Sequence, residues 1–289
     1  NIKTTVIRTR FAPSPTGPLH LGHAYSAILA HDFAKARGGD FVVRIEDIDK
    51  SRARSEWENK IFEDLEWLGL TWSSPVLRQS KRAAAYEFAI NKLWADGLLY
   101  SCNCSRRDIK ESAMAPQGEG QTNYGPDGII YPGTCRQEKY SNQRPQDSAL
   151  RLDMARATIN CSTIQDQNIK MDGLRDNNNV INTAQFIESI GDVVLSRKSK
   201  EVAYHLAVVV DDEAQAISHV VRGSDLKSST DIHVLLQKLL GYTSPWYLHH
   251  KLIRDTAGKR LAKRDDAKSI SKFREQGCSP VDVRTLVGL

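Results

Sequence analysis

Two histidines three residues apart stand near the start of the chain, in the segment Pro13-Ser14-Pro15-Thr16-Gly17-Pro18-Leu19-His20-Leu21-Gly22-His23. Residues three apart share one face of a helix, so both imidazoles can donate hydrogen bonds to neighbouring phosphates. The first amides of a helix are unpaired and attract anions, and Gly22 leaves room for an adenine ring beside the backbone. The segment predicts a nucleotide site, with an incidental pair of histidines as the alternative.

A second chemical signal is a concentration of positive charge near the end of the chain. The segment Lys251 to Lys272 holds eight Lys or Arg against three Asp, a surplus equal to the net charge of +5 of the whole chain. Such a run is commonly a solvated face, and its alternative interpretation is contact with the phosphates of ATP or RNA. The residues alone leave both interpretations open.

Three cysteines form the third group, because Cys102 and Cys104 are separated by one residue and Cys135 follows 31 residues later. Three thiolates suit Zn²⁺, which prefers four ligands in structural sites. No histidine occurs in this part of the sequence, so the residues alone leave water, Asp108 or a zinc-free trio of reduced thiols as alternatives. We expect a metal site here.

These groups must be positioned by alternating strands and helices. The histidine segment lies between a β-branched run and a helical pattern, which predicts a strand, a loop and a helix, followed by another strand. This βαβ order predicts an α/β protein with a Rossmann-like parallel sheet. The expected strands are Thr4 to Ala12 and Phe41 to Ile45, and the expected helices are Leu19 to Arg37, Glu56 to Leu68 and Ala83 to Asp96.

The middle of the chain has a different texture. Short polar segments and a Gly/Gln/Pro-rich stretch, Ala115 to Gly128, follow the cysteine pair, and regular patterning returns at Gly191 to Leu195, Tyr204 to Val210, Ala216 to Val221 and Ser229 to Leu240. We expect an inserted zinc-binding subdomain and a short C-terminal helical or loop segment. The predicted divisions are 1–100 for the first half of the core, 101–190 for the insert, 191–242 for the second half and 243–289 for the C-terminal segment.

The motifs together resemble the glutamyl-tRNA synthetase family of class I aminoacyl-tRNA synthetases. The segments Arg10 to Gly17 and His20 to His23 stand where the family has its first signature, and Arg44 to Asp49 follows as it does there. Lys259 to Arg264 resembles the second, mobile signature, although Ala262 stands where serine is usual. The resemblance covers nearly the whole chain.

This resemblance implies ATP-dependent formation of glutamyl-adenylate, with Mg²⁺ accompanying the ATP. It implies that His20, Gly22 and His23 bind ATP, and that His20, His23 and Lys263 are catalytic. Lys263 would also bind ATP and would stabilise charge on the leaving pyrophosphate. In-line attack by a carboxylate demands no catalytic base, so alignment, magnesium and positive charge carry the acceleration.

The resemblance also implies a glutamate pocket. Two carboxylates and an ammonium require cationic forks and an acidic or hydroxyl group. Arg10 would bind a carboxylate, Ser14 and Glu46 the amino-acid head, and Tyr204 and Arg222 would close the pocket, all at the ends of strands. Singly, each has a structural alternative: Arg10 and Glu46 as a surface ion pair, Tyr204 as an ordinary strand residue.

For the metal, the resemblance to the shorter relatives implies that Tyr131, four residues before Cys135, is the fourth zinc ligand beside Cys102, Cys104 and Cys135. Only 25 residues follow Arg264, whereas full-length members continue through an anticodon-binding region. The short relatives imply glutamate transfer to queuosine in the anticodon stem-loop of tRNA(Asp), with glutamate activated in the absence of tRNA. The alternatives are a conventional core that lacks its anticodon domain and a non-catalytic RNA-binding paralogue.

The composition sets the remaining expectations. With 40% hydrophobic and 26% charged residues, the 289-residue chain can bury a large core. No run approaches the length of a membrane span, the start does not resemble a signal peptide, and five cysteines do not form a disulfide framework. We expect a cytoplasmic protein in a reducing compartment, monomeric and without a membrane partner.

Overall fold

The computed structural model describes residues 6–114, 123–136, 143–161, 163–259, 261 and 267–289. Its helices are α1 (Leu21–Lys35), α2 (Ser55–Trp67), α3 (Ala83–Ala95), α4 (Arg106–Met114), α5 (Met154–Ala157), α6 (Thr183–Ser189), α7 (Tyr204–Ala214), α8 (Thr230–Leu240), α9 (Ile270–Glu275) and α10 (Pro280–Val287). Its strands are β1 (Arg8–Phe11), β2 (Asp40–Ile45), β3 (Ser73–Arg78), β4 (Leu99–Cys102), β5 (Tyr124–Gly125), β6 (Gly128–Ile129), β7 (Ala149–Leu152), β8 (Thr163–Gln165), β9 (Val180–Asn182), β10 (Val194–Ser196), β11 (His219–Gly223) and β12 (Trp246–His250).

The centre of the molecule is parallel sheet. Strands β1, β2 and β3 pair in that order, β11 pairs with β12, and every one of these pairs is parallel. Strands β1 and β11 lie side by side, since the Ser218 amide donates to the Arg8 carbonyl at 3.0 Å and the Arg8 amide donates to Ser218 Oγ at 2.8 Å. The predicted α/β fold with a parallel sheet is confirmed.

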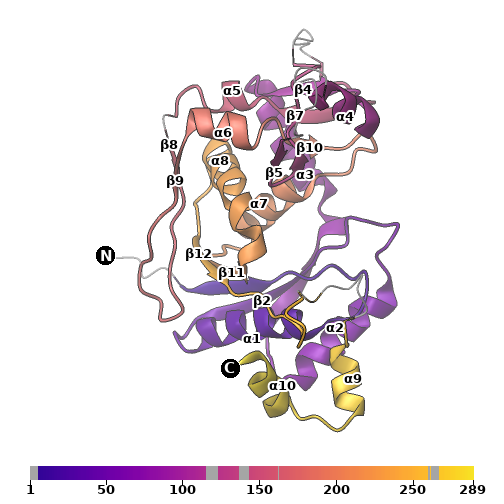
Figure 1. Cartoon of the computed structure of the whole chain (residues 1–289), viewed down its shortest axis with the longest axis vertical. Helices are drawn as coiled ribbons and strands as arrows, with labels where there is room; N and C mark the ends of the chain where they lie inside the picture. The colour runs from indigo at the N-terminus through magenta and orange to yellow at the C-terminus, as the bar shows by residue number, and fades with distance from the viewer. Residues whose placement is uncertain (1–5, 115–122, 137–142, 162, 260, 262–266) are drawn as a thin grey trace.

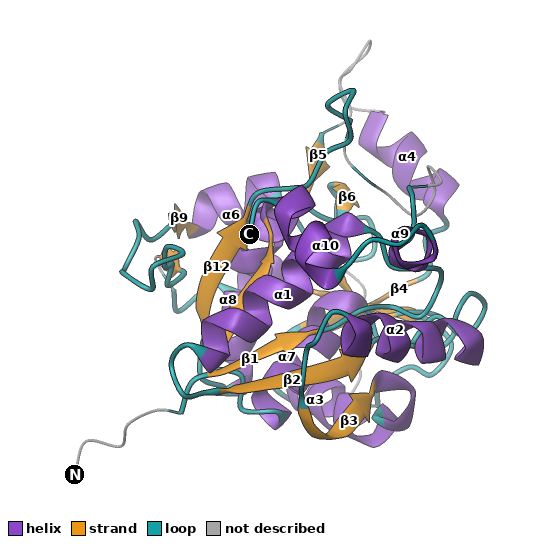
Figure 2. Cartoon of the chain, turned by 90° about the horizontal axis from the view of Figure 1, so that it is seen from below, coloured by secondary structure: helices purple, strands orange, loops and turns teal. Residues whose placement is uncertain are grey.

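The two faces of this sheet carry alternate residues of the same strands, because side chains alternate across a strand. Phe41, Val43 and Leu248 point into a core shared with α1, whereas Val42 and Tyr247 join the core on the other face. Helix α1 covers one face and α7 and α8 the other, as Figures 1 and 2 show from two directions. Burial on both faces explains the short apolar runs at residues 41–43 of β2 and 246–248 of β12.

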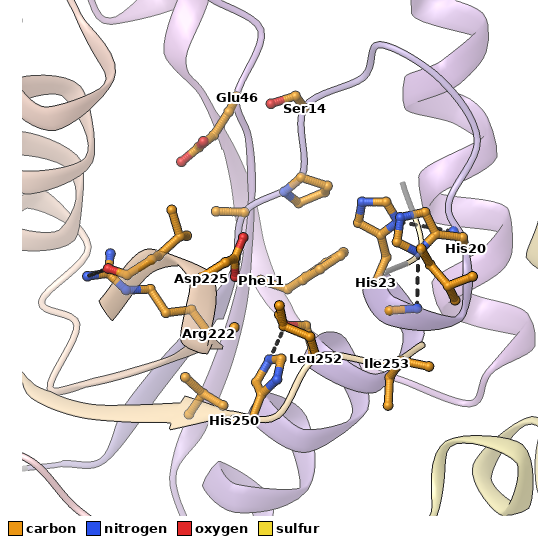
Figure 3. A pocket seen from close by; sticks show the side chains of 18 of the residues that line it. Phe11, Ser14, His20, His23, Glu46, Arg222, Asp225, His250, Leu252 and Ile253 are labelled. Atoms are coloured by element: carbon orange, nitrogen blue, oxygen red, sulfur yellow. Dashed lines mark hydrogen bonds between the residues drawn. The ribbon is translucent and has the colours of Figure 1, made fainter. Parts of the chain in front are cut away.

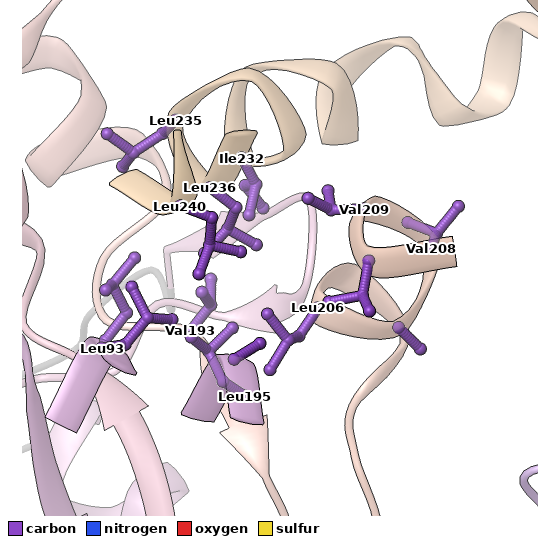
Figure 4. Packing of buried hydrophobic residues seen from close by; sticks show 14 of the residues in the cluster. Leu93, Val193, Leu195, Leu206, Val208, Val209, Ile232, Leu235, Leu236 and Leu240 are labelled. Atoms are coloured by element: carbon purple, nitrogen blue, oxygen red, sulfur yellow. The ribbon is translucent and has the colours of Figure 1, made fainter. Parts of the chain in front are cut away.

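Helices α7 and α8 pack on each other through a dense aliphatic layer (Figure 4). Leu206 and Val209 of α7 meet Ile232, Leu236 and Leu240 of α8, and all five are buried. Fully burying one such side chain is worth roughly 1.5–3 kcal/mol. This layer fixes the first turns of both helices, which carry polar residues at the end of the sheet.

A separate antiparallel sheet lies above the parallel sheet in Figure 1. It has the order β10-β7-β4, with Leu99 opposite Leu152 and Val194 opposite Arg151. The sheet therefore combines β4 at the start of the predicted insert, β7 within it and β10 just beyond its end. The domain divisions given above are not tested by this pairing and stay predictions.

The end of the chain returns to the histidine segment. The Ile270 amide donates to the Leu19 carbonyl at 2.9 Å, and Arg284 of α10 pairs with Asp32 of α1 at 2.6 Å. Val283 and Val287 are buried against the core that α1 shares with the sheet. Consequently, the described residues that flank the predicted second signature lie close to the first one.

Membrane insertion finds no support in the described helices, since none of them combines the length and the apolar character that a membrane span requires.

Candidate active site and metal centre

A pocket of about 630 Å³ opens where the carboxyl ends of the parallel strands meet. Arg10 comes from β1, Glu46 directly follows β2, and Arg222 is the penultimate residue of β11. Ligands of open parallel sheets bind at such ends, between strands whose connections run to opposite sides. The structure gathers around this pocket the predicted residues Arg10, Ser14, His20, Gly22, His23, Glu46, Tyr204 and Arg222.

The histidines and the acid-arginine group occupy opposite sides of the pocket (Figure 3). The His20 ring caps the start of α1: the Gly22 amide donates to His20 Nδ1 at 3.0 Å, and the His20 amide donates to His23 Nδ1 at 3.0 Å. Because both Nδ1 atoms accept, a neutral ring must carry its proton on Nε2. The cap therefore leaves Nε2–H as the donor of each ring at the positive end of the α1 dipole, where phosphate binding is favoured.

Position 22 requires glycine for a second reason, in addition to the room for a ligand that the sequence suggested. A Cβ atom at this position would lie 2.9 Å from His20 Cε1, closer than packed atoms tolerate. Any larger residue would push the capping ring of His20 out of place. Room for His20, as well as room for a ligand, requires glycine here.

Arg10 does not form a surface ion pair with Glu46, the structural alternative considered for this pair. Both Arg10 and Arg44 donate instead to Asp212 Oδ1 of α7, at 3.0 and 2.8 Å, and all three side chains are buried. Burial favours the protonated acid, but the two guanidinium charges outweigh it and hold the pKa of Asp212 below its ordinary value. Asp212 thus fixes Arg10 at the pocket wall.

Glu46 faces the pocket beside this buried group. Its Oε1 lies 3.4 Å from Arg44 Nε, and its amide donates to the Pro13 carbonyl at 3.0 Å, which ties the end of β2 to the loop that carries Ser14. Burial raises the pKa of Glu46, although Arg44 and Arg10 oppose the rise. An ammonium group placed in the pocket would favour the ionised carboxylate.

Tyr204 was predicted from the sequence at the end of a strand, and this prediction was wrong. Tyr204 is the first residue of helix α7. The run Val208-Val209-Val210 is β-branched, and a helix buried on most sides has no polar face to reveal its period. Tyr204 nevertheless lines the pocket, and burial raises the pKa of its phenol.

Three polar residues that line the pocket were missed in the prediction from the sequence: Ser26, Asp225 and His250. His250, at the end of β12, hydrogen bonds through Nε2 to Ser26 Oγ, while its Nδ1 donates to the Lys251 carbonyl at 2.8 Å. Asp225 lies beside Gly223, where a Cβ atom would approach its Oδ1 to 2.4 Å. The sequence Gly223-Ser224-Asp225 is typical of a turn and could have indicated Asp225. No local motif indicates His250.

The predicted second signature is only partly described. Leu261 lines the pocket, and its amide lies 3.4 Å from the Ile253 carbonyl. Ala262 and Lys263 lie outside the described residues, so the predicted catalytic and ATP-binding role of Lys263 stays a prediction.

The three cysteines come together in the antiparallel region. The Sγ atoms of Cys102, Cys104 and Cys135 all lie within 4.8 Å of one another, with Cys104 and Cys135 3.5 Å apart. Zn–S bonds of about 2.3 Å in tetrahedral geometry place ligand sulfurs about 3.8 Å apart. The cluster therefore has the dimensions of a metal site, and the expectation that these thiols gather is confirmed.

Tyr131 completes the group. Its hydroxyl lies 3.5 Å from Cys102 Sγ and 3.4 Å from Cys104 Sγ, and it accepts from the Cys135 amide at 2.9 Å. The Arg151 guanidinium stacks 3.9 Å above its ring. Asp108, an alternative fourth ligand, instead accepts from the Ser105 amide at 2.7 Å at the start of α4.

Comparison with known proteins points in one direction. The family model described as tRNA synthetases class I (E and Q), catalytic domain, matches residues 6–289. The chain is 53% identical to the glutamyl-Q tRNA(Asp) synthetase of Rhodobacter capsulatus over 97% of its own length and 99% of that protein. It is 38% identical to the protein of the same name from Geobacter sulfurreducens, over 92% of this chain and 78% of that one.

Solved structures agree in fold. The glutamate tRNA ligase of Elizabethkingia meningosepticum, solved in complex with its amino acid, superposes with a TM-score of 0.75 at 26% identity. The match covers 97% of this chain but 60% of that one, so the chain spans less than two thirds of the solved ligase.

Proposed function

Since the chain belongs to the class I tRNA synthetases (E and Q), and among them to the glutamyl-Q tRNA(Asp) synthetases, we propose that it activates glutamate with ATP and transfers it to queuosine of tRNA(Asp). The observation that most supports the chemistry is one pocket with two unlike ends. The histidines that can donate hydrogen bonds to phosphates lie at one end, and cationic and acidic side chains lie at the other.

In the first step, a carboxylate oxygen of glutamate attacks the α-phosphorus of ATP and pyrophosphate leaves. His20 and His23 bind the phosphates through Nε2–H, and Lys263 stabilises the charge that develops on pyrophosphate. Mg²⁺ arrives with ATP. The protein supplies alignment and positive charge and does not need a general base, because the attacking carboxylate is already ionised.

At the other end of the pocket, Arg10 and Arg222 bind the carboxylates of glutamate, and Ser14 and Glu46 hold its head group. Tyr204 closes the pocket from α7. In the second step, a hydroxyl of the cyclopentenediol ring of queuosine attacks the glutamyl carbonyl, and AMP leaves. The anticodon loop of tRNA(Asp) therefore enters the pocket to which other synthetases bring a 3′ end.

For the metal centre, we propose that Cys102, Cys104, Cys135 and Tyr131 hold a structural Zn²⁺. Three thiols and a phenol within ligand distance of one another fit a closed four-coordinate site. When bound, zinc would tie the end of β4 to the Tyr131–Cys135 turn. None of the reaction steps passes through it.

Glutamate-dependent exchange of labelled pyrophosphate into ATP tests the first step without RNA. The proposal predicts exchange with glutamate, and at least about tenfold less with glutamine or aspartate, because buried polar groups would then lack a partner. Glu46→Gln, which keeps the shape of the side chain, should weaken exchange. Absence of exchange with every amino acid would contradict the activity and favour a paralogue that only binds RNA.

A further inference from the structure

We propose that His233 and His205 are positioning residues, which hold Arg222 by neutral acceptors so that its positive charge remains available to a substrate carboxylate. The inference rests on the proposed function, since it concerns the glutamate end of the same pocket. It concerns two histidines that do not line the pocket themselves. They lie behind Arg222, buried at the starts of α8 and α7.

The hydrogen bonds run in one direction along this chain of side chains. Arg222 NH1 lies 3.1 Å from His233 Nδ1, and a guanidinium can only donate, so Nδ1 must accept. The proton of His233 is then on Nε2, which lies 3.0 Å from Nδ1 of His205. The proton of His205 is in turn on Nε2, which points to Asp127 Oδ1 at 3.3 Å.

This directionality requires Nδ1 to accept in both histidines. A second proton on His233 would face the cation of Arg222, and one on His205 Nδ1 would face the Nε2–H of His233. Burial lowers the pKa of His233 well below its ordinary value, and Arg222 and His205 lower it further. Arg222 is therefore held by an acceptor that adds no negative charge.

The other hydrogen-bond partners of Arg222 are also uncharged acceptors. Its NH2 donates to Thr230 Oγ1 at 2.8 Å and lies 3.4 Å from the Leu226 carbonyl, while its Nε lies 3.4 Å from His249 Nε2. Together with His233, these partners occupy four of its five N–H groups. Among the described residues, one N–H group is left for a ligand, and Arg222 lines the pocket where that ligand would sit.

The arginine on the neighbouring strand is held differently. Arg10 donates to the carboxylate of Asp212, which it shares with Arg44, so its charge is partly balanced within the protein. No carboxylate in the described part of the chain forms an ion pair with Arg222. The acid of its network, Asp127, is separated from it by two imidazole rings. Arg222 is thus the less neutralised cation of the pair and has the greater attraction for a substrate carboxylate.

Asn and Asp at position 233 separate geometry from charge. Both are shorter than histidine and have nearly equal shapes, and either can place an oxygen near the position of Nδ1. Only Asp adds a carboxylate beside Arg222. We expect His233→Asn to leave the glutamate KM within about threefold of wild type, and His233→Asp to raise it at least about tenfold, the change that follows from about 1.4 kcal/mol.

The KM for ATP should stay within about twofold in both variants, because the histidines of the ATP end are on α1. His219→Asp is the matched control, since His219 is a partly buried histidine on β11 whose Nδ1 contacts Ser218 rather than Arg222. It should leave the glutamate KM unchanged. His205→Leu, which removes the acceptor for His233, should raise this KM by a smaller factor than His233→Asp.

Pyrophosphate exchange gives both constants, and a thermal melt of each variant reports folding. Equal glutamate KM values for folded His233→Asn and His233→Asp would overturn the inference. If a His233 variant does not fold, folded His205→Leu decides, and an unchanged glutamate KM would then overturn it. Failure of the wild-type protein to exchange with glutamate would instead overturn the proposed function.

Discussion

Individual side chains in this pocket differ mainly in how their charge is balanced. Asp212 serves two arginines from one buried position, and its ionised form depends on both. Removing one partner from a buried group of charges leaves the others unpaired, which costs far more than losing an exposed pair. Strand β1 carries both a buried and a half-exposed arginine ion pair. Arg10 pairs with the buried Asp212, whereas Arg8 pairs with Asp40 at 2.8 Å at a half-exposed position.

Replacing the two acids in turn measures this difference. Asp212→Asn should lower the free energy of unfolding by about 3 kcal/mol or more, since Arg10 would be buried without its ion-pair partner and Arg44 would keep only Glu46. Asp40→Asn should lower it by less than about 1 kcal/mol, because solvent screens its partner Arg8. Urea denaturation of both variants at pH 7 checks the prediction. Similar losses in the two variants would contradict it.

The sequence predicted the residues that face the pocket better than the residues behind them. Arg10, Glu46 and His20 belong to short motifs near the ends of the first two strands, where local order is informative. Asp212 acts through Arg10, more than 200 residues away, and His233 acts through Arg222 and His205, which belong to a different strand and a different helix. Such contacts depend on packing of α7 and α8 against the sheet, and a single sequence does not reveal it.

At the scale of the elements, the buried carboxylate of Asp64 connects helix α2 to helix α9 near the end of the chain. Asp64 lies in the last turn of α2, its Oδ1 3.7 Å from Arg274 of α9, and its Oδ2 is buried without a hydrogen-bond partner among the described residues. Burial raises its pKa to about 6, against the opposing charges of Arg274 and Lys60. A carboxylate near the end of a helix also opposes the helix dipole.

The pH dependence follows from this shift. Because the pKa of Asp64 is higher in the folded state, its protonation favours folding, an effect complete below about pH 4 and lost as the pH rises through about 6. We therefore expect Asp64→Asn to stabilise the protein by about 1–2 kcal/mol at pH 8 and by about half that amount at pH 5, where the unfolded carboxyl is already ionised. Urea unfolding at both pH values measures this. A gain that is equal at both would contradict the burial argument.

The metal centre joins two further elements, the end of β4 and the turn from Tyr131 to Cys135. Cys104→Ser should reduce bound zinc from about one ion per chain to nearly none, because a three-ligand site does not close around the ion. Cys161→Ser is the control, since Cys161 lies outside the cluster. Elemental analysis of protein purified with a reductant but no chelator decides. Zinc retained by Cys104→Ser, or absent from the wild type, would contradict the assignment.

Elements with a clear period were predicted closely, and the exceptions have a physical cause. Helix α1 was expected over Leu19 to Arg37 and spans Leu21–Lys35, because apolar residues mark its buried face and the glycines after it mark its end. Tyr204 was expected at the end of a strand and is instead the first residue of helix α7, in which residues 205–212 are all buried. Burial removes the polar positions from which a helical period is recognised.

At the scale of the whole molecule, three segments that are far apart in the sequence line one pocket: residues 10–46, 204–226 and 250–261. The segment after the second signature returns to Leu19, and the network behind Arg222 ends at Asp127 in the turn between β5 and β6. Motif order in the sequence predicted that these regions act together. It could not predict the contact between β1 and β11, which joins strands more than 200 residues apart.

The central claim concerns the acceptor, and one measurement tests it directly. The protein is incubated with ATP and labelled glutamate, together with tRNA(Asp) that carries queuosine, the same tRNA without queuosine, or tRNA(Glu), and the label retained on each RNA is counted. We predict label on the queuosine-bearing tRNA(Asp) alone. Label on tRNA(Glu), or equal label on tRNA(Asp) with and without queuosine, would contradict the account.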